Sequence, residues 1–218
     1  MIANKNCIIR LSRYKNALGR LRALGFVKVF SDNLADAVGV TAAQVRKDFS
    51  IFALSGNKRG GYKVEELIDK INHILGKNEL HRVIIVGAGK LGTALLKYKG
   101  FEKEGIKISA CFDIDPSKYN STQEVPVLAL DELGAFVKKN NIKIGIIAVP
   151  DIAAQHAADA MIAAGIKGIL NFAPMRLRDV EGCVVNNVNL EVELENLIYF
   201  VNVQEKTRVE SADNINNK

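Results

Sequence analysis

Two hydrophobic patterns divide the chain near residue 80. Before it, apolar residues recur every three or four positions, which is the spacing of helices that bury one face. After it, short Val/Ile runs alternate with helical patterns, which is typical of a doubly wound parallel sheet. The polar connector Gly76–His81 separates the two patterns. We therefore predict an α/β protein with a helical domain at residues 1–78 and a sheet domain at residues 79–187.

The same patterns set the expected elements. Helices are predicted over Ile8–Leu24, Ser31–Val38, Thr41–Leu54, Val64–Leu75, Lys90–Lys99, Asp131–Asn140 and Ile152–Ala164. Strands are predicted over Val83–Val86, Ile106–Phe112, Ile142–Val149, Gly168–Leu170 and Cys183–Val185. Residues 188–204 fit a strand and a helix equally well, and residues 205–218 form a polar tail that we expect to fray.

The second and third predicted helices form a helix-turn-helix pattern. Ser31 is a natural N-cap of the second helix, and Gly39 ends it in a tight turn. Thr41 at the N-cap of the third helix and Gln44 three residues later form a capping box. The third helix is expected to turn Val45, Phe49 and Phe52 inward and Gln44, Arg46, Lys47 and Ser50 outward.

The segment Ser55–Tyr62 is glycine-rich and basic, which is the composition of a β-hairpin wing with Lys58 and Arg59 at its tip. Residues 1–63 hold 12 Lys and Arg against 3 Asp and Glu, whereas the rest of the chain carries a net charge of −3. A basic front half favours a polyanionic partner, and charge alone fits a solvated basic face equally well. The residues predicted to contact DNA are Thr41, Gln44, Arg46, Lys47, Ser50, Lys58, Arg59 and Tyr62.

The sheet domain opens with a strand that runs directly into a G-x-G-x-x-G motif. Gly87 lets the strand turn, Gly89 lets the backbone approach a pyrophosphate, and Gly92 lets the following helix pack closely. Asp113 ends the next strand 21 residues after Gly92, where a carboxylate holds the ribose hydroxyls of NAD. No Arg follows in Ile114-Asp115, so Asp113 is expected to exclude NADP by repelling its 2′-phosphate.

In such Rossmann-type sheets, ligands bind beyond the carboxyl ends of the strands. Ala148-Val149-Pro150 and Asn171–Pro174 each lie where a predicted strand ends, so these two loops are expected to wall the nicotinamide end of the site. Pro150 also fits the simpler role of a residue that starts a helix.

Several features narrow the possible functions. The three cysteines, Cys7, Cys111 and Cys183, form no C-x-x-C pair, which favours reduced thiols in a cytoplasmic protein over a redox pair. The three histidines, His73, His81 and His156, have no metal-ligand spacing with them, so no metal site is expected. No apolar run reaches the about 18 residues of a membrane span, and no secretory signal is recognised, so no membrane partner is expected.

A basic winged helix followed by an NAD-type Rossmann domain resembles the Rex family of redox-sensing transcriptional repressors. The resemblance runs from about Ile8 to Val203, and the segments that carry it are Val40–Asp48, Gly61-Tyr62, His73–Gly76, Val86–Gly92 and Ala164–Pro174. It implies a homodimer whose C-terminal helix, residues 188–204, is exchanged between subunits and packs between the partner's two domains. It also implies a two-fold symmetric operator DNA that is released by NADH.

This sequence departs from the family pattern at several positions. A family Arg on the first helix and a family Asp before the exchanged helix are replaced by Asn16 and Asn189, so redox coupling is expected to differ or to weaken. Leu190 stands where an aromatic often follows, whereas Tyr98, which is implicated in the family, is present. The predicted residues of the NADH/NAD⁺ site are Gly87, Ala88, Gly89, Lys90, Leu91, Gly92, Tyr98, Asp113, Val149, Pro150, Asn171, Phe172 and Leu190.

We expect a sensor with no catalytic residues. NAD⁺ carries a positive charge at the nicotinamide that NADH lacks, and an apolar pocket of Val149, Pro150, Phe172 and the partner's Leu190 disfavours a cation. The competing interpretation is a small NAD-dependent dehydrogenase with a basic cap, which needs a proton donor near its substrate. No Tyr has a Lys four residues on, and only His156 among the histidines could lie near the site.

Overall fold

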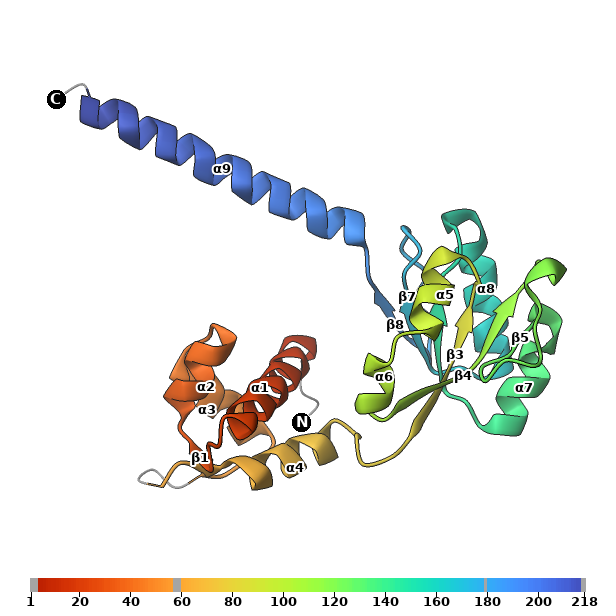
Figure 1. The fold of residues 1–218 in the computed structure, drawn as a ribbon, viewed down its shortest axis with the longest axis horizontal. Helices are drawn as coiled ribbons and strands as arrows, with labels where there is room; N and C mark the ends of the chain where they lie inside the picture. Colours follow the sequence, from red (N-terminus) through yellow and green to blue (C-terminus); the bar gives the residue numbers. More distant parts are fainter. Residues whose placement is uncertain (1–3, 57–59, 179, 217–218) are drawn as a thin grey trace. The chain divides into compact units, whose positions relative to one another are not determined.

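The computed structural model describes residues 4–56, 60–178 and 180–216, with side chains described up to residue 207. The chain divides into two compact units, Met1–Leu80 and His81–Lys218, which are described separately (Figure 1). None of the described helices is long and apolar enough to cross a membrane.

The first unit is a helical bundle with a small two-stranded sheet. Its elements are α1 (Lys5–Ala23), β1 (Lys28–Val29), α2 (Ser31–Val38), α3 (Ala42–Ile51), β2 (Tyr62–Lys63) and α4 (Val64–Ile74). Helix α1 packs against α2 and α4, and α2 packs against α3. Their apolar faces meet in one core that includes Leu11, Leu18, Val45, Phe49 and Ile71, so α3 is held by the whole unit rather than by α2 alone.

Three details of this unit differ from the predictions. Helix α3 ends at Ile51, because Ala53 adopts a left-handed φ of 53° that breaks the helix before Leu54. The N-cap of α2 is Phe30 rather than Ser31, since Phe30 donates its backbone N–H to Asn33 at 2.9 Å. Strand β2 pairs antiparallel with β1, so the described part of the wing segment leads into a strand whose partner precedes α2.

The second unit is an open sheet flanked by helices. Its strands are β3 (His81–Val86), β4 (Ile106–Asp113), β5 (Val127–Ala129), β6 (Ile144–Ile147), β7 (Gly168–Asn171) and β8 (Val184–Asn187). Its helices are α5 (Lys90–Leu96), α6 (Gly100–Lys103), α7 (Leu133–Asn140), α8 (Asp151–Ala164) and α9 (Leu190–Asn216), with 3-10 turns at Pro116–Lys118 and Leu130–Glu132. All neighbouring strands pair in parallel in the order β5-β4-β3-β6-β7-β8.

This strand order is that of the dinucleotide-binding Rossmann fold, and it confirms the predicted fold class. Helices α7 and α8 cover one face of the sheet, and α5 and α6 cover the other, as Figure 1 shows. The strands are Val/Ile-rich because both faces are buried. The order reverses between β3 and β6, and the carboxyl ends of these strands form the crevice in which such folds bind ligands.

Two predicted helices have different bounds. The helix expected over Lys90–Lys99 is divided into α5 and α6, and Tyr98 lies in the break with its ring over Gly100. Residues 188–204 belong to helix α9, which continues to Asn216 through the expected polar tail. Asn189 caps α9, since its side-chain oxygen accepts hydrogen bonds from the backbone N–H groups of Glu191 and Val192.

Candidate DNA-binding surface and dinucleotide site

Helix α3 separates its buried and exposed residues as its sequence predicts. Val45 and Phe49 are buried in the core, whereas Arg46 and Lys47 are exposed. Thr41 caps the helix, and its hydroxyl accepts a hydrogen bond from the backbone N–H of Gln44 at 3.1 Å. The first turn of α3 is therefore fixed at its main chain while its cations face solvent.

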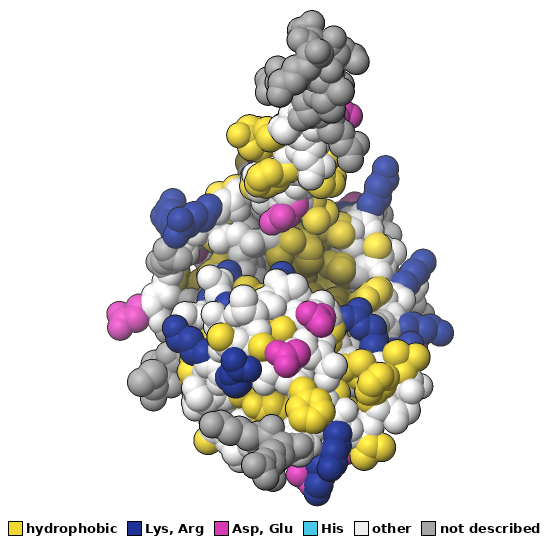
Figure 2. All heavy atoms as spheres, turned by 90° about the vertical axis from the view of Figure 1, so that its left-hand side faces the viewer, with side chains coloured by type: hydrophobic (Ala, Val, Ile, Leu, Met, Phe, Trp, Pro, Cys, Tyr) yellow, Lys and Arg dark blue, Asp and Glu magenta, His cyan; other side chains and the backbone are white. Residues whose placement is uncertain are grey.

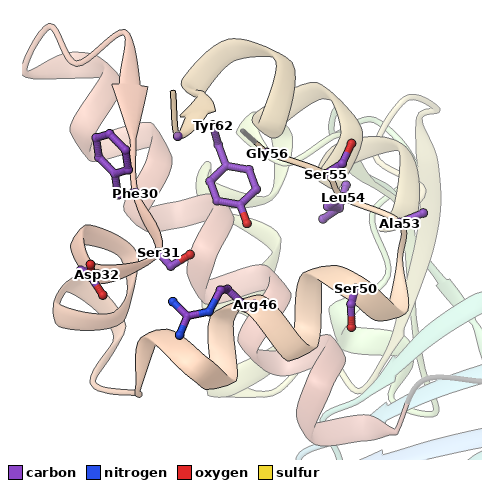
Figure 3. Close-up of a pocket in the computed structure, with 11 residues that line it drawn as sticks. Phe30, Ser31, Asp32, Arg46, Ser50, Ala53, Leu54, Ser55, Gly56 and Tyr62 are labelled. Atoms are coloured by element: carbon purple, nitrogen blue, oxygen red, sulfur yellow. The ribbon is translucent and has the colours of Figure 1, made fainter. Parts of the chain in front are cut away.

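A groove of about 570 Å³ lies between α3, the start of α2 and the segment that leads into β2 (Figure 3). Arg46 points into this groove from α3. Tyr62 packs its ring edge-on against Phe49, with ring centres 5.2 Å apart, and turns its hydroxyl to the groove.

Of three further predicted DNA contacts, the structure describes one, Ser50. Ser50 is exposed, and its hydroxyl donates to the backbone oxygen of Lys47 at 2.7 Å, so its hydrogen is used within α3. Lys58 and Arg59 lie outside the described residues.

The capping box is only half formed. Gln44 donates its side-chain N–H to Asp48 at 2.8 Å, and so its side chain runs along the helix rather than back to the N-cap. The cause is Asp48, which is 1% exposed and offers a buried carboxylate that attracts donors more strongly than a neutral acceptor does. Our sequence reasoning missed Asp48, although its spacing of four residues from Gln44 on a helix was a usable signal.

The turn from β3 into α5 has the geometry that its glycines predict. Gly87 has a φ of 108°, and a Cβ there would lie 2.4 Å from the backbone oxygen of Ala148 at the end of β6. A Cβ on Gly92 would lie 1.8 Å from the backbone oxygen of Gly87. A Cβ on Gly89 would meet nothing within 4 Å, so the protein itself leaves space at the position where a pyrophosphate approaches.

Asp113 lies beside this turn, at the carboxyl end of β4. Its carboxylate accepts hydrogen bonds from the backbone N–H groups of Ala88 at 2.7 Å and Asp115 at 2.9 Å, and from Nζ of Lys118 at 3.1 Å. Burial raises the pKa of Asp113, but these three donors outweigh it and lower the pKa below its usual range. The group is therefore a carboxylate at neutral pH, as binding of ribose hydroxyls requires.

Lys118 is a second residue that our sequence reasoning missed. The expectation that Asp113 repels a 2′-phosphate considered only Ile114 and Asp115, whereas the 3-10 turn at Pro116–Lys118 returns a cation to the carboxylate. Lys118 is 38% exposed, so its charge reduces the repulsion without removing it.

Five further predicted cofactor residues fall into two groups. Val149 and Phe172 are half-buried at the ends of β6 and β7, and Pro150 is exposed at the N-cap of α8. Tyr98 and Leu190 are 59% and 60% exposed, at the break between α5 and α6 and at the start of α9. Both of these side chains lie outside the hydrophobic cores of the chain.

Asn171 is fully buried at the end of β7, and its side-chain amide holds the local structure together. It donates to the backbone oxygen of Met175 at 2.8 Å and to the side-chain oxygen of Asn187 on β8 at 2.9 Å. Its own oxygen accepts from the backbone N–H of Ala173 at 3.0 Å. These bonds position the loop that carries Phe172.

Residues 4–50 match a family model described as a putative DNA-binding protein N-terminus, and residues 78–175 match a CoA binding domain model. Fold and site thus define a class of regulator in which a helix-turn-helix unit precedes a nucleotide-binding unit. The redox-sensing transcriptional repressor Rex of Carboxydothermus hydrogenoformans is 45% identical, over 89% of this chain and 94% of its own. The chain belongs to the Rex family of redox-sensing transcriptional repressors.

Other relatives agree. Rex of Bacillus subtilis is 42% identical over 88% of this chain and 89% of its own. Among solved structures, RSP in complex with NAD⁺ and operator DNA is 35% identical and has a TM-score of 0.89 over 95% of this chain and 96% of its own. RSP in complex with NADH has a TM-score of 0.85 at 36% identity, over 95% of this chain and 98% of its own.

Proposed function

We propose that this chain is a redox-responsive repressor that binds operator DNA as a homodimer and releases it when NADH binds. Residues 1–78 bind the operator, residues 79–187 hold the dinucleotide, and residues 188–204 form the exchanged helix. The observation that carries the proposal is the match over 95% of the chain to RSP, which has been solved with NAD⁺ and operator DNA and with NADH.

The DNA-binding half is supported by the exposed face of α3. Two such helices in a dimer enter successive major grooves about 34–36 Å apart. Arg46 and Lys47 are exposed on a helix whose opposite face is buried, so they reach bases or phosphates without disturbing the core. Thr41, Gln44, Ser50 and Tyr62 surround them, and Lys58 and Arg59 complete the proposed surface in the wing.

The dinucleotide half is supported by the fit of the turn after β3. The open space at Gly89 accommodates the pyrophosphate against backbone N–H groups, and Asp113 accepts the ribose hydroxyls. These groups bind the part of the cofactor that NADH and NAD⁺ share. The selective part is the apolar wall of Val149, Pro150 and Phe172, because a cationic nicotinamide loses hydration there that the wall does not replace.

The homodimer is supported by α9. Its described side chains are all exposed, among them Leu194, Leu197, Ile198, Tyr199 and Phe200, and Figure 2 shows hydrophobic side chains gathered on this helix. Contiguous exposed apolar surface of this kind is typical of a subunit interface. Asn189 caps α9 with a neutral side chain, where the family resemblance implies a charged Asp, so we propose that redox coupling through this position is weaker.

An enzymatic function is less well supported. His156 lies on the exposed side of α8, and the relatives are named repressors rather than dehydrogenases. We propose that the bound dinucleotide acts as a signal and is not consumed.

Two variants of the full-length protein test the two halves in one titration. Arg46→Ala is expected to weaken operator binding and to leave NADH affinity unchanged. Asp113→Ala is expected to weaken NADH binding by about tenfold or more, since it removes charge-assisted hydrogen bonds, and to leave the DNA affinity of the cofactor-free protein unchanged. Wild-type operator affinity in Arg46→Ala, or wild-type NADH affinity in Asp113→Ala, contradicts the corresponding half.

A further inference from the structure

A buried carboxylate connects helix α3 to helix α1 in the first unit. Asp48 accepts two hydrogen bonds from the Arg10 guanidinium, at 2.6 and 2.7 Å, and one from the Tyr14 hydroxyl at 2.9 Å. It also accepts from the Cys7 thiol at 3.4 Å and from the side-chain N–H of Gln44 at 2.8 Å. Three of these four donor residues lie on α1, and the fourth, the half-buried Gln44, lies on α3 itself.

Asp48 is ionised over the whole physiological range. Burial raises its pKa, but the hydrogen bonds from Arg10, Gln44, Tyr14 and Cys7 outweigh burial and lower the pKa to about 2. An ionised carboxylate only accepts hydrogen bonds. Gln44 must therefore turn its NH₂ group to Asp48, because its own oxygen would be repelled there.

Hydrogen bonds fix both the main chain and the side chain of Gln44. Its backbone N–H is bound by the Thr41 hydroxyl at 3.1 Å, and its side-chain nitrogen is bound by Asp48 at 2.8 Å. It is half-buried in the first turn of α3, next to the exposed Lys47. The N-terminal residues of a recognition helix are those that contact base edges in the major groove. If α3 lies in the major groove of DNA, Gln44 presents an amide whose orientation is already set, so the contact costs less side-chain entropy than it does for a free Gln.

The groups left on the amide define what it can recognise. A Gln amide has two N–H donors and one oxygen, and Asp48 takes one donor. One N–H and one C=O remain side by side. Adenine presents N7 as an acceptor and N6 as a donor in the major groove, whereas guanine presents two acceptors. The remaining pair of groups matches adenine and mismatches guanine.

We propose that Gln44 reads an adenine in each operator half-site and that Asp48 is the positioning residue that sets its amide for this contact. The inference rests on the proposed function, because it assumes that α3 enters the major groove of a specific operator. It extends that function by naming the base and the group that selects it. Arg46 and Lys47, as cations, supply phosphate or guanine contacts on the same helix.

The first experiment defines the position that Gln44 reads. The wild-type, full-length protein without cofactor selects duplexes from a random library at fixed salt, and each base pair of the selected half-site is then replaced in turn. Gln44→Ala is expected to lose the preference for adenine at one symmetric position by about 5- to 150-fold and to keep all other preferences. If Gln44→Ala keeps every preference, or loses one for another base, the proposal is wrong.

A modified base tests the geometry directly. Replacing the adenine at that position by 7-deazaadenine removes the N7 acceptor and keeps the N6 amino group. The wild type is expected to lose several-fold in affinity, and Gln44→Ala is expected to lose nothing. Equal losses in both proteins would overturn the bidentate contact.

The role of Asp48 is tested with Asp48→Asn, which keeps the shape of the side chain and removes its charge. Its expected effect is a weaker adenine preference at the same position, with an unchanged salt dependence of binding, since phosphate contacts are untouched. In a Gln44→Ala background the Asp48→Asn change is expected to have no further effect at that position. The matched control is Asp36→Asn, an exposed carboxylate on α2, which is expected to keep all preferences.

The outcomes separate this proposal from the function on which it rests. If the wild type selects no duplex, or NADH does not release the selected one, the proposed function fails. If selection and release are intact but Asp48→Asn weakens binding to all sequences equally, Asp48 is only structural and the positioning role fails. If Asp48→Asn does not fold, Gln44→Ala and the modified base still decide whether Gln44 reads adenine.

Discussion

Asp48 and Asp113 are both buried carboxylates with a lowered pKa, but they differ in where their donors come from. Asp48 is surrounded by side chains of its own unit, from Cys7, Arg10, Tyr14 and Gln44. Asp113 accepts two backbone N–H groups and one half-exposed lysine at the edge of a crevice. The first arrangement fixes a scaffold, and the second leaves a carboxylate ready for a ligand. Burial and pKa alone do not distinguish a scaffold from a site, whereas the origin of the donors does.

The largest expected effect comes from removing the scaffold carboxylate. Asp48→Ala leaves the mostly buried Arg10 guanidinium and the buried Tyr14 hydroxyl without their acceptor, which is expected to cost about 3–5 kcal/mol of unfolding free energy. Denaturant unfolding of the full chain measures it, and Asp36→Ala is the control with an exposed carboxylate. A loss below about 1 kcal/mol would show that the network is not a scaffold.

Acid is expected to weaken the same network. The folded pKa of Asp48, about 2, lies below the usual value of about 3.9, so its contribution is complete above a pH of about 5 and is lost as the pH falls through 2. The contribution is about 2.5 kcal/mol. It is measured as the difference in unfolding free energy between wild type and Asp48→Asn across this pH range. A difference that does not change with pH contradicts the assignment.

Substitution of Gly89, in the turn beside Asp113, is expected to have a smaller effect that is confined to NADH affinity. Gly89→Ala is expected to leave the fold intact, because a Cβ there meets nothing within 4 Å and the backbone is extended. The methyl group would stand where the pyrophosphate approaches, so NADH affinity is expected to fall about tenfold or more. Calorimetric titration with NADH measures this.

Gly134→Ala is the matched control for that variant, since Gly134 on α7 also has open space at its Cβ position. It is expected to bind NADH as the wild type does. Equal affinities of Gly89→Ala and Gly134→Ala would remove the turn after β3 from the cofactor site.

The smallest expected effect comes from removing Lys118, whose side chain donates a hydrogen bond to Asp113. Lys118→Ala removes a 38% exposed ion pair, which is worth about 0–1 kcal/mol, so NADH affinity is expected to change by no more than about fivefold. Discrimination against NADPH is expected to increase, because the remaining carboxylate repels a 2′-phosphate without compensation. Binding titrations with NADH and NADPH measure both, and weaker discrimination in the variant contradicts this account of Lys118.

Much of the fold follows from local patterns. The Val/Ile runs, the three glycines after β3 and the cap at Thr41 each depend on residues close in sequence, and each was predicted in place. The predicted helix ends were less accurate. The start of α2 depends on a local hydrogen bond at Phe30, and the end of α3 depends on the left-handed backbone of Ala53. Hydrophobic spacing encodes neither feature.

The missed residues depend on side-chain contacts that hydrophobic spacing does not encode. Asp48 is buried only because Arg10 and Tyr14, more than 30 residues earlier, donate to it. Lys118 contacts Asp113 only because the chain turns at Pro116. Asn171 stays a predicted cofactor residue, and the sequence did not indicate that its amide bonds to Met175 and to Asn187 on β8. The hydrophobic pattern of a helix or strand predicts which of its faces is exposed, but not which side chain from another segment contacts that face.

The central claim is that occupancy of the dinucleotide site controls the affinity with which α3 binds DNA. Its most direct test is operator binding by the wild-type protein, titrated separately with NADH and with NAD⁺ at one fixed salt concentration. We predict that NADH releases the duplex at a concentration about tenfold or more below that of NAD⁺, a difference of about 1.4 kcal/mol. A duplex that stays bound at saturating NADH, or is released equally by both forms, contradicts the claim.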